Sequence, residues 1–331
     1  MTGSRPIVLL TDRAWPDDSV ERGVVETAGF RLVAGPPEPA AAQVIEELML
    51  EHRPAAVLTC WAPVSARAIR SSPDLQVVAR LGVGLDNIDV ASATEAGVLV
   101  TNVPDYCVAE VSDHAVAMVL AWTRGIVISD RAVRAGQWEP AGARLRRLST
   151  LTCGIVGYGR IGRETARKLA AFGCRVLATD PNPPQDRSLA SFVDLDSLLT
   201  ESDVVILHAP LVPQTRGLIG KDQLSRMRPG SLLVNVSRGG LVDTAALTEA
   251  LVGGHLSGAG LDVLDTEPDV PADLLAQPTA VLTPHIAFSS DVSLTDLRRS
   301  AAEEVVRVLR GEPPLHPRNT PAPRTSPLEK R

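Results

Sequence analysis

The chain has 331 residues, 44% hydrophobic and 22% charged, which is enough for two globular domains with sizeable cores. Its formal net charge of −6 argues against a general nucleic-acid binder, which normally presents a basic face. No apolar run is long enough for a membrane span or a signal peptide, and the four cysteines form no C-x-x-C pair, so we expect a cytoplasmic protein with buried free thiols.

The first hundred residues alternate between patterns typical of strands and of helices. Strands are expected at 6–10, 55–59, 76–80 and 99–102, and helices at 20–28, 41–51, 64–71 and 90–96. Such alternation predicts a parallel sheet covered on both faces. The next helix, expected over 109–124, is apolar around most of its circumference. A helix of that kind must be buried against more than one surface, and a subunit interface is one way to achieve this.

A dinucleotide-binding fingerprint begins near the middle of the chain. Gly157, Gly159 and Gly162 form a G-x-G-x-x-G between a strand-like run and a helix-like run over 163–172. A second strand, expected at 175–179, ends at Asp180. The first glycine permits a tight turn, the second lets the backbone approach a pyrophosphate, and the third lets the helix pack close to the strand. An acid after the second strand binds ribose hydroxyls and repels a 2′-phosphate, which favours NAD over NADP.

Three residues suited to hydride-transfer chemistry follow strands further along the chain. Strands are expected at 204–208, 231–236, 259–263 and 280–282, and Arg238, Glu267 and His285 come after the last three of them. Open α/β sheets bind ligands at the carboxyl ends of their strands. There, a histidine can exchange a proton with a substrate, a carboxylate can stabilise its imidazolium form, and an arginine can hold a carboxylate.

Each of these residues also has an ordinary structural interpretation. His285 alone is compatible with a capped loop, Arg238 with a surface salt bridge, and Glu267 with a helix start. Their occurrence after three successive strands favours a shared site. The last helix is expected over 294–310, and the segment after it, with six prolines between 311 and 331, predicts an extended or disordered tail.

Five motifs stand out between residues 157 and 287: Gly157-Tyr-Gly-Arg-Ile-Gly162, His208-Ala-Pro-Leu211 through Thr215, Asn235-Val-Ser-Arg-Gly239, Leu261-Asp-Val263 with Glu267-Pro268, and Thr283-Pro-His-Ile-Ala287. By these motifs the chain resembles, from about residue 55 to 315, the D-isomer-specific 2-hydroxyacid dehydrogenases, the family of phosphoglycerate, glyoxylate and formate dehydrogenases.

The resemblance implies a role for each matched residue. Arg238, Glu267 and His285 would be catalytic, with Asp262 on the nicotinamide amide and the backbone N–H groups of Val83 and Gly84 on the substrate carboxylate. The other implied cofactor-binding residues are Gly157, Gly159, Arg160, Ile161, Gly162, Asp180, His208, Pro210, Thr215 and Val236. Trp61 and Phe288 are hypothesised to form an apolar wall of the substrate site, although core packing explains them equally well. No metal is implied.

The resemblance also implies the architecture: two Rossmann-like, doubly wound parallel-sheet domains, with the NAD domain inserted into a split substrate domain. The substrate domain would comprise 1–102 and 286–318, the NAD domain 103–285, and a flexible tail 319–331. Catalysis would occur in a cleft that closes by a hinge. A homodimer through the region of the 109–124 helix is expected.

Two departures from known subfamilies narrow the range of expected substrates, and alternatives remain. Phosphoglycerate dehydrogenases carry an Arg-Ser pair in the stretch where this chain has Thr59-Cys60-Trp61, and phosphite dehydrogenases carry a lysine where it has Val83. A small, D-configured 2-oxo or 2-hydroxy acid is therefore expected, with 3-phosphoglycerate or a phosphonate or phosphite analogue as the alternative. An alternative from another class is an NADH-sensing protein similar to the C-terminal-binding corepressors, with weak or no turnover.

Overall fold

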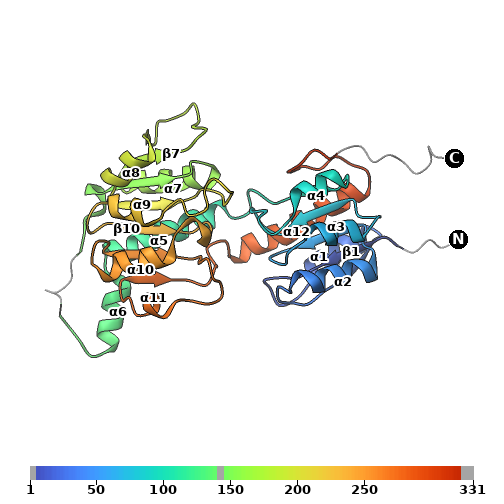
Figure 1. Cartoon of the computed structure of the whole chain (residues 1–331), viewed down its shortest axis with the longest axis horizontal. Coiled ribbons are helices and arrows are strands. Elements are labelled where there is room, and N and C mark those ends of the chain that lie inside the picture. Colours follow the sequence, from blue (N-terminus) through green and yellow to red (C-terminus); the bar gives the residue numbers. More distant parts are fainter. Residues whose placement is uncertain (1–4, 140–144, 322–331) are drawn as a thin grey trace. The chain divides into compact units, whose positions relative to one another are not determined.

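The structure, a computed structural model, describes residues 5–139 and 145–321 and divides into two units (Figure 1). The first comprises residues up to Tyr106 and from Ser290 onward, and the second comprises Cys107–Ser289. The second unit is thus inserted into the first. The divisions follow residues 106 and 289, each four residues later than the expected 102 and 285.

The first unit is a five-stranded sheet with helices on both faces. All pairings are parallel, in the order β2-β1-β3-β4-β5. Its elements are β1 (Ile7–Leu10), α1 (Ser19–Thr27), β2 (Arg31–Ala34), α2 (Ala42–His52), β3 (Ala56–Thr59), α3 (Ala66–Ser71), β4 (Val77–Arg80), α4 (Val90–Glu95), β5 (Leu99–Thr101) and α12 (Asp291–Leu309).

The strands of this unit are apolar because both sheet faces are covered. Val8 and Leu10 of β1 face one core, which includes residues of α1 and α12, and Leu9 faces another, which includes residues of α2, α3 and α4. Residues from both ends of the chain therefore build the core between β1 and α12.

The segment after α12 is anchored to the edge strand β5, in contrast to the tail predicted from residue 319 onward. Arg318 donates its backbone N–H to the carbonyl of Val100 at 2.8 Å. The side chain of Asn319 accepts from Val100 N and donates to Thr94 Oγ1 and Val98 O. Side-chain partners of this kind leave no periodicity in the sequence. The remainder of the predicted tail, from 322 onward, lies outside the described residues.

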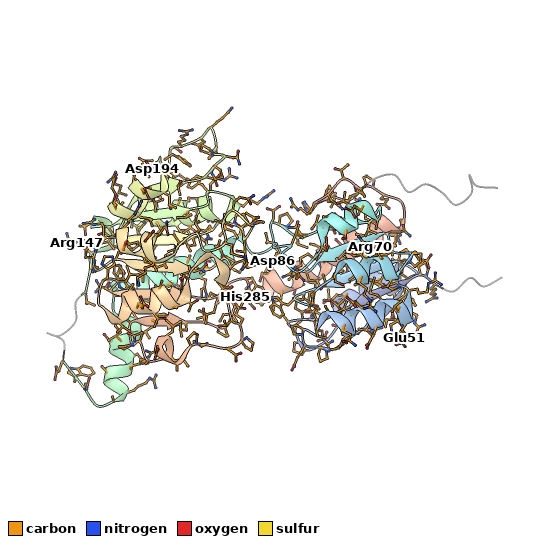
Figure 2. All side chains as sticks on the ribbon, viewed as in Figure 1. Glu51, Arg70, Asp86, Arg147, Asp194 and His285 are labelled. Carbon is orange, nitrogen blue, oxygen red and sulfur yellow. The ribbon has the colours of Figure 1, made fainter. Side chains whose placement is uncertain are left out.

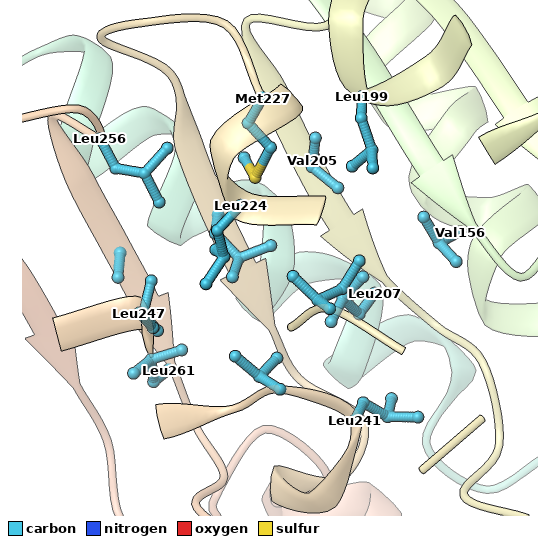
Figure 3. Close-up of a cluster of buried hydrophobic side chains, with 14 of the residues drawn as sticks. Val156, Leu199, Val205, Leu207, Leu224, Met227, Leu241, Leu247, Leu256 and Leu261 are labelled. Atoms are coloured by element: carbon cyan, nitrogen blue, oxygen red, sulfur yellow. The ribbon is translucent and has the colours of Figure 1, made fainter. Parts of the chain in front are cut away.

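The second unit is a seven-stranded parallel sheet in the order β12-β11-β10-β9-β6-β7-β8. Its elements are α5 (Val108–Thr123), α6 (Ile126–Arg134), β6 (Thr152–Val156), α7 (Arg160–Ala171), β7 (Arg175–Thr179), β8 (Ser191–Phe192), α8 (Leu195–Glu201), β9 (Val204–Leu207), α9 (Lys221–Arg226), β10 (Leu232–Asn235), α10 (Thr244–Val252), β11 (Gly258–Leu261), α11 (Ala272–Leu275) and β12 (Ala280–Leu282). Figure 3 shows part of the core that packs α8, α9 and α10 on this sheet. Both sheets confirm the predicted doubly wound fold class.

Helix α5 is covered mainly by its own unit. It packs against α7, β10 and β11. A Cβ added to Gly260 of β11 would stand 2.8 Å from the sulfur of Met118 on α5, so the helix lies unusually close to the sheet. The apolar circumference of α5 therefore reflects burial within one chain and does not by itself require a second subunit.

No single helix of the described segments is long and apolar enough to cross a bilayer, although α5 and α6, which are bent by 59°, pass this test together. The four cysteines are free and buried, as the sequence predicts.

We predict that the stability of the first unit depends on a buried ion pair between helices from its two chain segments. Arg298 of α12 donates three hydrogen bonds to Glu21 of α1, whose side chain is fully buried. Glu21→Gln removes a carboxylate partner of the largely buried Arg298 guanidinium. The variant should lose roughly 3 kcal/mol of unfolding free energy, measured by urea denaturation. The control Glu26→Gln removes an exposed pair with Arg22 and should cost about 0–1 kcal/mol. Equal losses in the two variants would contradict this role.

Candidate active site

The glycine fingerprint forms the turn between β6 and the start of α7. Gly157 has a φ of +93°, and a Cβ there would stand 2.6 Å from Ala209 N. A Cβ on Gly162 would collide with the carbonyl of Gly157. Around Gly159, by contrast, no described atom lies within 4 Å of such a Cβ. The turn thus combines two positions where only glycine fits with one that leaves open space beside a helix N-terminus, as a bound pyrophosphate requires. Arg160 and Ile161 are the first two residues of α7.

Asp180 lies directly after β7 and is tied to the glycine turn. Its Oδ2 accepts the backbone N–H of Tyr158 at 2.7 Å, and its Oδ1 accepts that of Asn182 at 2.8 Å. The carboxylate is thereby held beside the turn, where it can accept ribose hydroxyl hydrogen bonds.

His208 contacts the helix that follows the glycine turn. Its Nε2 lies 2.9 Å from Thr165 Oγ1 of α7, and burial lowers the pKa of His208 to about 3, so the imidazole is neutral. In the loop that follows, Thr215 Oγ1 donates to the carbonyl of Pro210 at 2.6 Å. Val236 is buried at the end of β10. Contacts of these residues with the cofactor stay predictions.

Arg238 is presented by a tight turn after β10. Asn235 donates its side-chain N–H to the carbonyl of Arg238 at 2.8 Å and accepts the backbone N–H of Ser237. A Cβ on Gly239 would overlap the backbone at Leu264. The Arg-Gly pair therefore lets this turn pack directly on the loop that leads to Glu267.

Glu267 and His285 form a hydrogen-bonded pair. Glu267 Oε2 lies 2.8 Å from His285 Nδ1, and Oε1 accepts the backbone N–H of Leu264. Burial acts to raise the pKa of Glu267, but the hydrogen bond and charge of His285, the Leu264 N–H and the charge of Arg238 together lower it. Glu267 is thus held ionised on Nδ1, and Nε2 is the ring nitrogen that points away from the carboxylate.

The backbone at His285 is held in a left-handed conformation, with a φ of +53°, by Asp262. The two oxygens of this buried carboxylate accept the backbone N–H groups of Ile286 and Ala287, each at 2.9 Å. Oδ1 also accepts the hydroxyl of Thr283 at 2.6 Å. Asp262 therefore shapes the loop that carries His285, a role that the sequence did not reveal, while the expected nicotinamide contact stays a prediction.

His114 of α5 adds to this network and was expected only to be a packed or interface histidine. Its Nε2 lies 3.0 Å from Thr283 Oγ1 and 3.7 Å from Asp262 Oδ1. Phe288 packs edge-on to the ring of His285, with 6.2 Å between centroids. It therefore lies beside the histidine, while its hypothesised place in an apolar wall of the substrate site stays a prediction. Figure 2 labels His285 on the second unit.

The expected carboxylate-binding loop of the first unit, Gly82–Gly84, follows β4 and precedes Asp86, which Figure 2 labels. The carbonyls of Gly82 and Val83 accept hydrogen bonds from Val103 N and Asn102 Nδ2. Within the described parts of the chain, the N–H groups of Val83 and Gly84 have no acceptor. Successive unpaired N–H groups of this kind suit an anion. Trp61, also in the first unit, is partly buried against its core, and its backbone N–H donates to Asp12 Oδ2.

A glycine turn shaped for a pyrophosphate and the Asp180 carboxyl group beside it define a dinucleotide-binding unit, and the pair of His285 and Glu267 lies beyond the ends of its strands. Residues 116–287 match the family model described as "D-isomer specific 2-hydroxyacid dehydrogenase, NAD binding domain". The chain therefore belongs to the D-isomer-specific 2-hydroxyacid dehydrogenases, as the motifs predict, and the cofactor of its second unit is NAD.

Individual relatives support this assignment. The chain is 37% identical over 312 residues to D-3-phosphoglycerate dehydrogenase of Mycobacterium tuberculosis, covering 93% of this chain and 58% of that protein. It is 42% identical to a glyoxylate reductase of Korarchaeum cryptofilum, covering 76% and 78%. The solved structure of TT0316 protein from Thermus thermophilus is 34% identical with a TM-score of 0.86, covering 95% and 100%. The chain thus spans little more than half the length of the phosphoglycerate dehydrogenases it matches.

We predict that Asp180 sets cofactor preference through its charge and supports the turn through its oxygen. Asp180→Asn keeps an acceptor for Tyr158 N, so NADH affinity should fall less than in Asp180→Ala, where a loss of about tenfold is expected. Both variants should bind NADPH more tightly than the native protein does, because the repulsion of the 2′-phosphate is removed. Fluorescence titration with each cofactor measures this, and unchanged NADPH affinity in both variants would refute it.

We predict an acid-side stability difference from Glu267. Its pKa in the folded protein lies below the ordinary 4.5, so the stabilisation is fully present above that value and is lost as the pH falls through the lower folded pKa. Glu267→Gln removes this contribution, so its unfolding free energy should fall less steeply than that of the native protein below about pH 4.5. Urea denaturation between pH 3 and 6 measures both slopes, and parallel slopes would contradict the assignment.

Proposed function

We propose that this protein is an NAD-dependent dehydrogenase or reductase that acts on a small, D-configured 2-oxo or 2-hydroxy acid, with His285 as the acid and base. The observation that carries the proposal is the 2.8 Å pair between Glu267 and His285 Nδ1. When bound, NAD supplies or accepts the hydride. The protein's own groups must then hold the carboxylate of the substrate, polarise its carbonyl and move one proton.

The proton step follows from the arrangement at His285. In the direction of reduction, the imidazolium gives its Nε2 proton to the carbonyl oxygen of the substrate as the carbonyl carbon receives the hydride. In oxidation, the neutral ring takes the hydroxyl proton back. Glu267 stabilises the charged ring through Nδ1 and fixes its tautomer. The Asp262 carboxylate supports this step by holding the two backbone N–H groups that follow the histidine.

Substrate binding is divided between cationic and backbone donors. Arg238, which the turn after β10 presents, supplies a guanidinium for the carboxylate or carbonyl oxygen of the substrate. The unpaired N–H groups of Val83 and Gly84 supply neutral donors for the carboxylate. Trp61 and Phe288 are assigned to the side chain of the substrate.

An unphosphorylated substrate is favoured by the loop after β3. Cys60 is buried, and burial raises the pKa of its thiol to about 12, so it carries no charge. Neither it nor Trp61 can replace an arginine that holds a phosphate. Glyoxylate, named for the Korarchaeum relative, is therefore preferred over 3-phosphohydroxypyruvate, the substrate class that the phosphoglycerate dehydrogenase relatives suggest.

A homodimer in the cytoplasm is part of the proposal, with the interface centred on α6 and extending from α5. Ile126, Ile128 and Val133 of α6 are about half exposed in the single chain, and Trp138 is 80% exposed. Apolar side chains gathered on one short segment are typical of a subunit interface.

We predict that His285→Ala leaves NADH affinity unchanged and lowers turnover roughly 10²- to 10⁴-fold, because the proton donor is lost. NADH consumption with glyoxylate, hydroxypyruvate, longer 2-oxo acids and 3-phosphohydroxypyruvate measures turnover and ranks substrates. His52→Ala, at the end of α2, is the control and should retain native turnover. A His285→Ala variant as active as the control would refute the proton role. Tight NADH binding with no turnover on any substrate would favour the NADH-sensing alternative.

A further inference from the structure

Three consecutive peptide groups of the Gly82–Gly84 loop are held by donors to their carbonyls. Arg80 Nη1 donates to the carbonyl of Leu81, Val103 N to that of Gly82, and Asn102 Nδ2 to that of Val83 at 2.6 Å. Since C=O and N–H point in opposite directions in a trans peptide, holding each carbonyl fixes where the next residue's N–H points. The N–H of Gly84 is therefore oriented by Asn102.

Asn102 can perform this task only with its amide in one of two orientations. The side chain is 5% exposed, and one end of its amide only accepts whereas the other only donates. Arg318 Nε donates to Asn102 Oδ1 at 2.5 Å. This contact requires the oxygen to face Arg318, so the Nδ2 group must face the carbonyl of Val83. A flipped amide would place two oxygens against each other at the loop.

Arg318 is held beside Asn102 by contacts with the edge strand β5. Its backbone N–H bonds to Val100, the preceding Pro317 pairs with Thr101 in an antiparallel bridge, and the following Asn319 bonds to Val100 and Val98. These contacts place the Arg318 guanidinium at the end of β5. Asn102 is the residue that directly follows this strand. An arginine 216 residues away in sequence is thereby fixed against the asparagine that orients the loop.

We propose that Arg318 is a positioning residue for the substrate carboxylate: by setting the amide of Asn102, it fixes the Val83–Gly84 peptide whose N–H receives the carboxylate. This inference rests on the proposed function of the Gly82–Gly84 loop. It assigns a role in substrate binding to the segment after α12.

The first test combines kinetics with a double-mutant cycle. Arg318→Leu should raise KM for the best 2-oxo acid about tenfold while kcat changes less and the dissociation constant for NADH stays constant. Arg318→Lys, which keeps a donor, should restore most of the affinity. In an Asn102→Leu background, Arg318→Leu should have little further effect, because there is no amide left to orient. The control Arg299→Leu, an exposed arginine on α12, should leave KM unchanged.

Equal effects of Arg318→Leu in the native and Asn102→Leu backgrounds would overturn the proposal, since Arg318 would then act through its charge alone. An unchanged KM in Arg318→Leu would overturn it as well. Loss of thermal stability without a change in KM would indicate a merely structural contact.

The second test does not depend on turnover. With selective ¹⁵N-glycine labelling, the amide resonance of Gly84 reports the hydrogen bond to the carbonyl of the same peptide. It should move in Arg318→Leu and in Asn102→Leu, and return toward its native position in Arg318→Lys. If it stays in place in Arg318→Leu, the inference is wrong whatever the kinetics show. If it moves as expected while the native protein reduces no 2-oxo acid, the proposed function fails and the orientation of the loop by Arg318 stands.

Discussion

The site depends on backbone segments that approach each other more closely than any side chain would permit. At Gly157, Gly162 and Gly239 an added Cβ would collide with backbone atoms of a neighbouring segment. The first two close the turn before α7, and the third presses the Arg238 turn onto the loop that leads to Glu267. Such contacts are short because the packed interior has no space to relax, so they fix the relative positions of the groups on either side. The geometry of the candidate site follows from this constraint.

Hydrogen bonds from buried polar groups then determine which atoms are left for ligands. Asp262 accepts the N–H groups of the two residues that follow His285 and thereby stabilises a φ of +53°, which a residue other than glycine seldom adopts. In the first unit the loop after β4 has its carbonyls bonded and two N–H groups unpaired among the described residues. In both places the side chain that supports the loop is a different group from the one assigned to the substrate. Mutation of the supporting side chain can therefore be distinguished from mutation of the substrate-binding group.

Much of the fold could be predicted because local patterns dictated it. The expected strands at 6–10, 76–80 and 280–282 agree with β1, β4 and β12 to within a residue, since continuous apolar runs between turns reflect strands that are buried on both faces. Helix α6 was missed, because its apolar residues are exposed in the single chain and its pattern was not separable from that of α5. The apolar circumference of α5 was recognised, but its covering by α7 and the sheet depends on tertiary packing.

The sequence by itself determined the family and the cofactor turn, and it predicted Arg238, Glu267 and His285 as the candidate site, because spacing relative to strands and helices is local information. Only the tertiary structure decided how these groups are held. The contacts of His114 with Thr283, and of Arg318 with Asn102, join residues 169 and 216 positions apart. A hydrogen bond between distant side chains produces no periodic pattern in the sequence, so the sequence does not indicate which two residues form it. It exists only after the sheets have formed and brought the two side chains to the same edge.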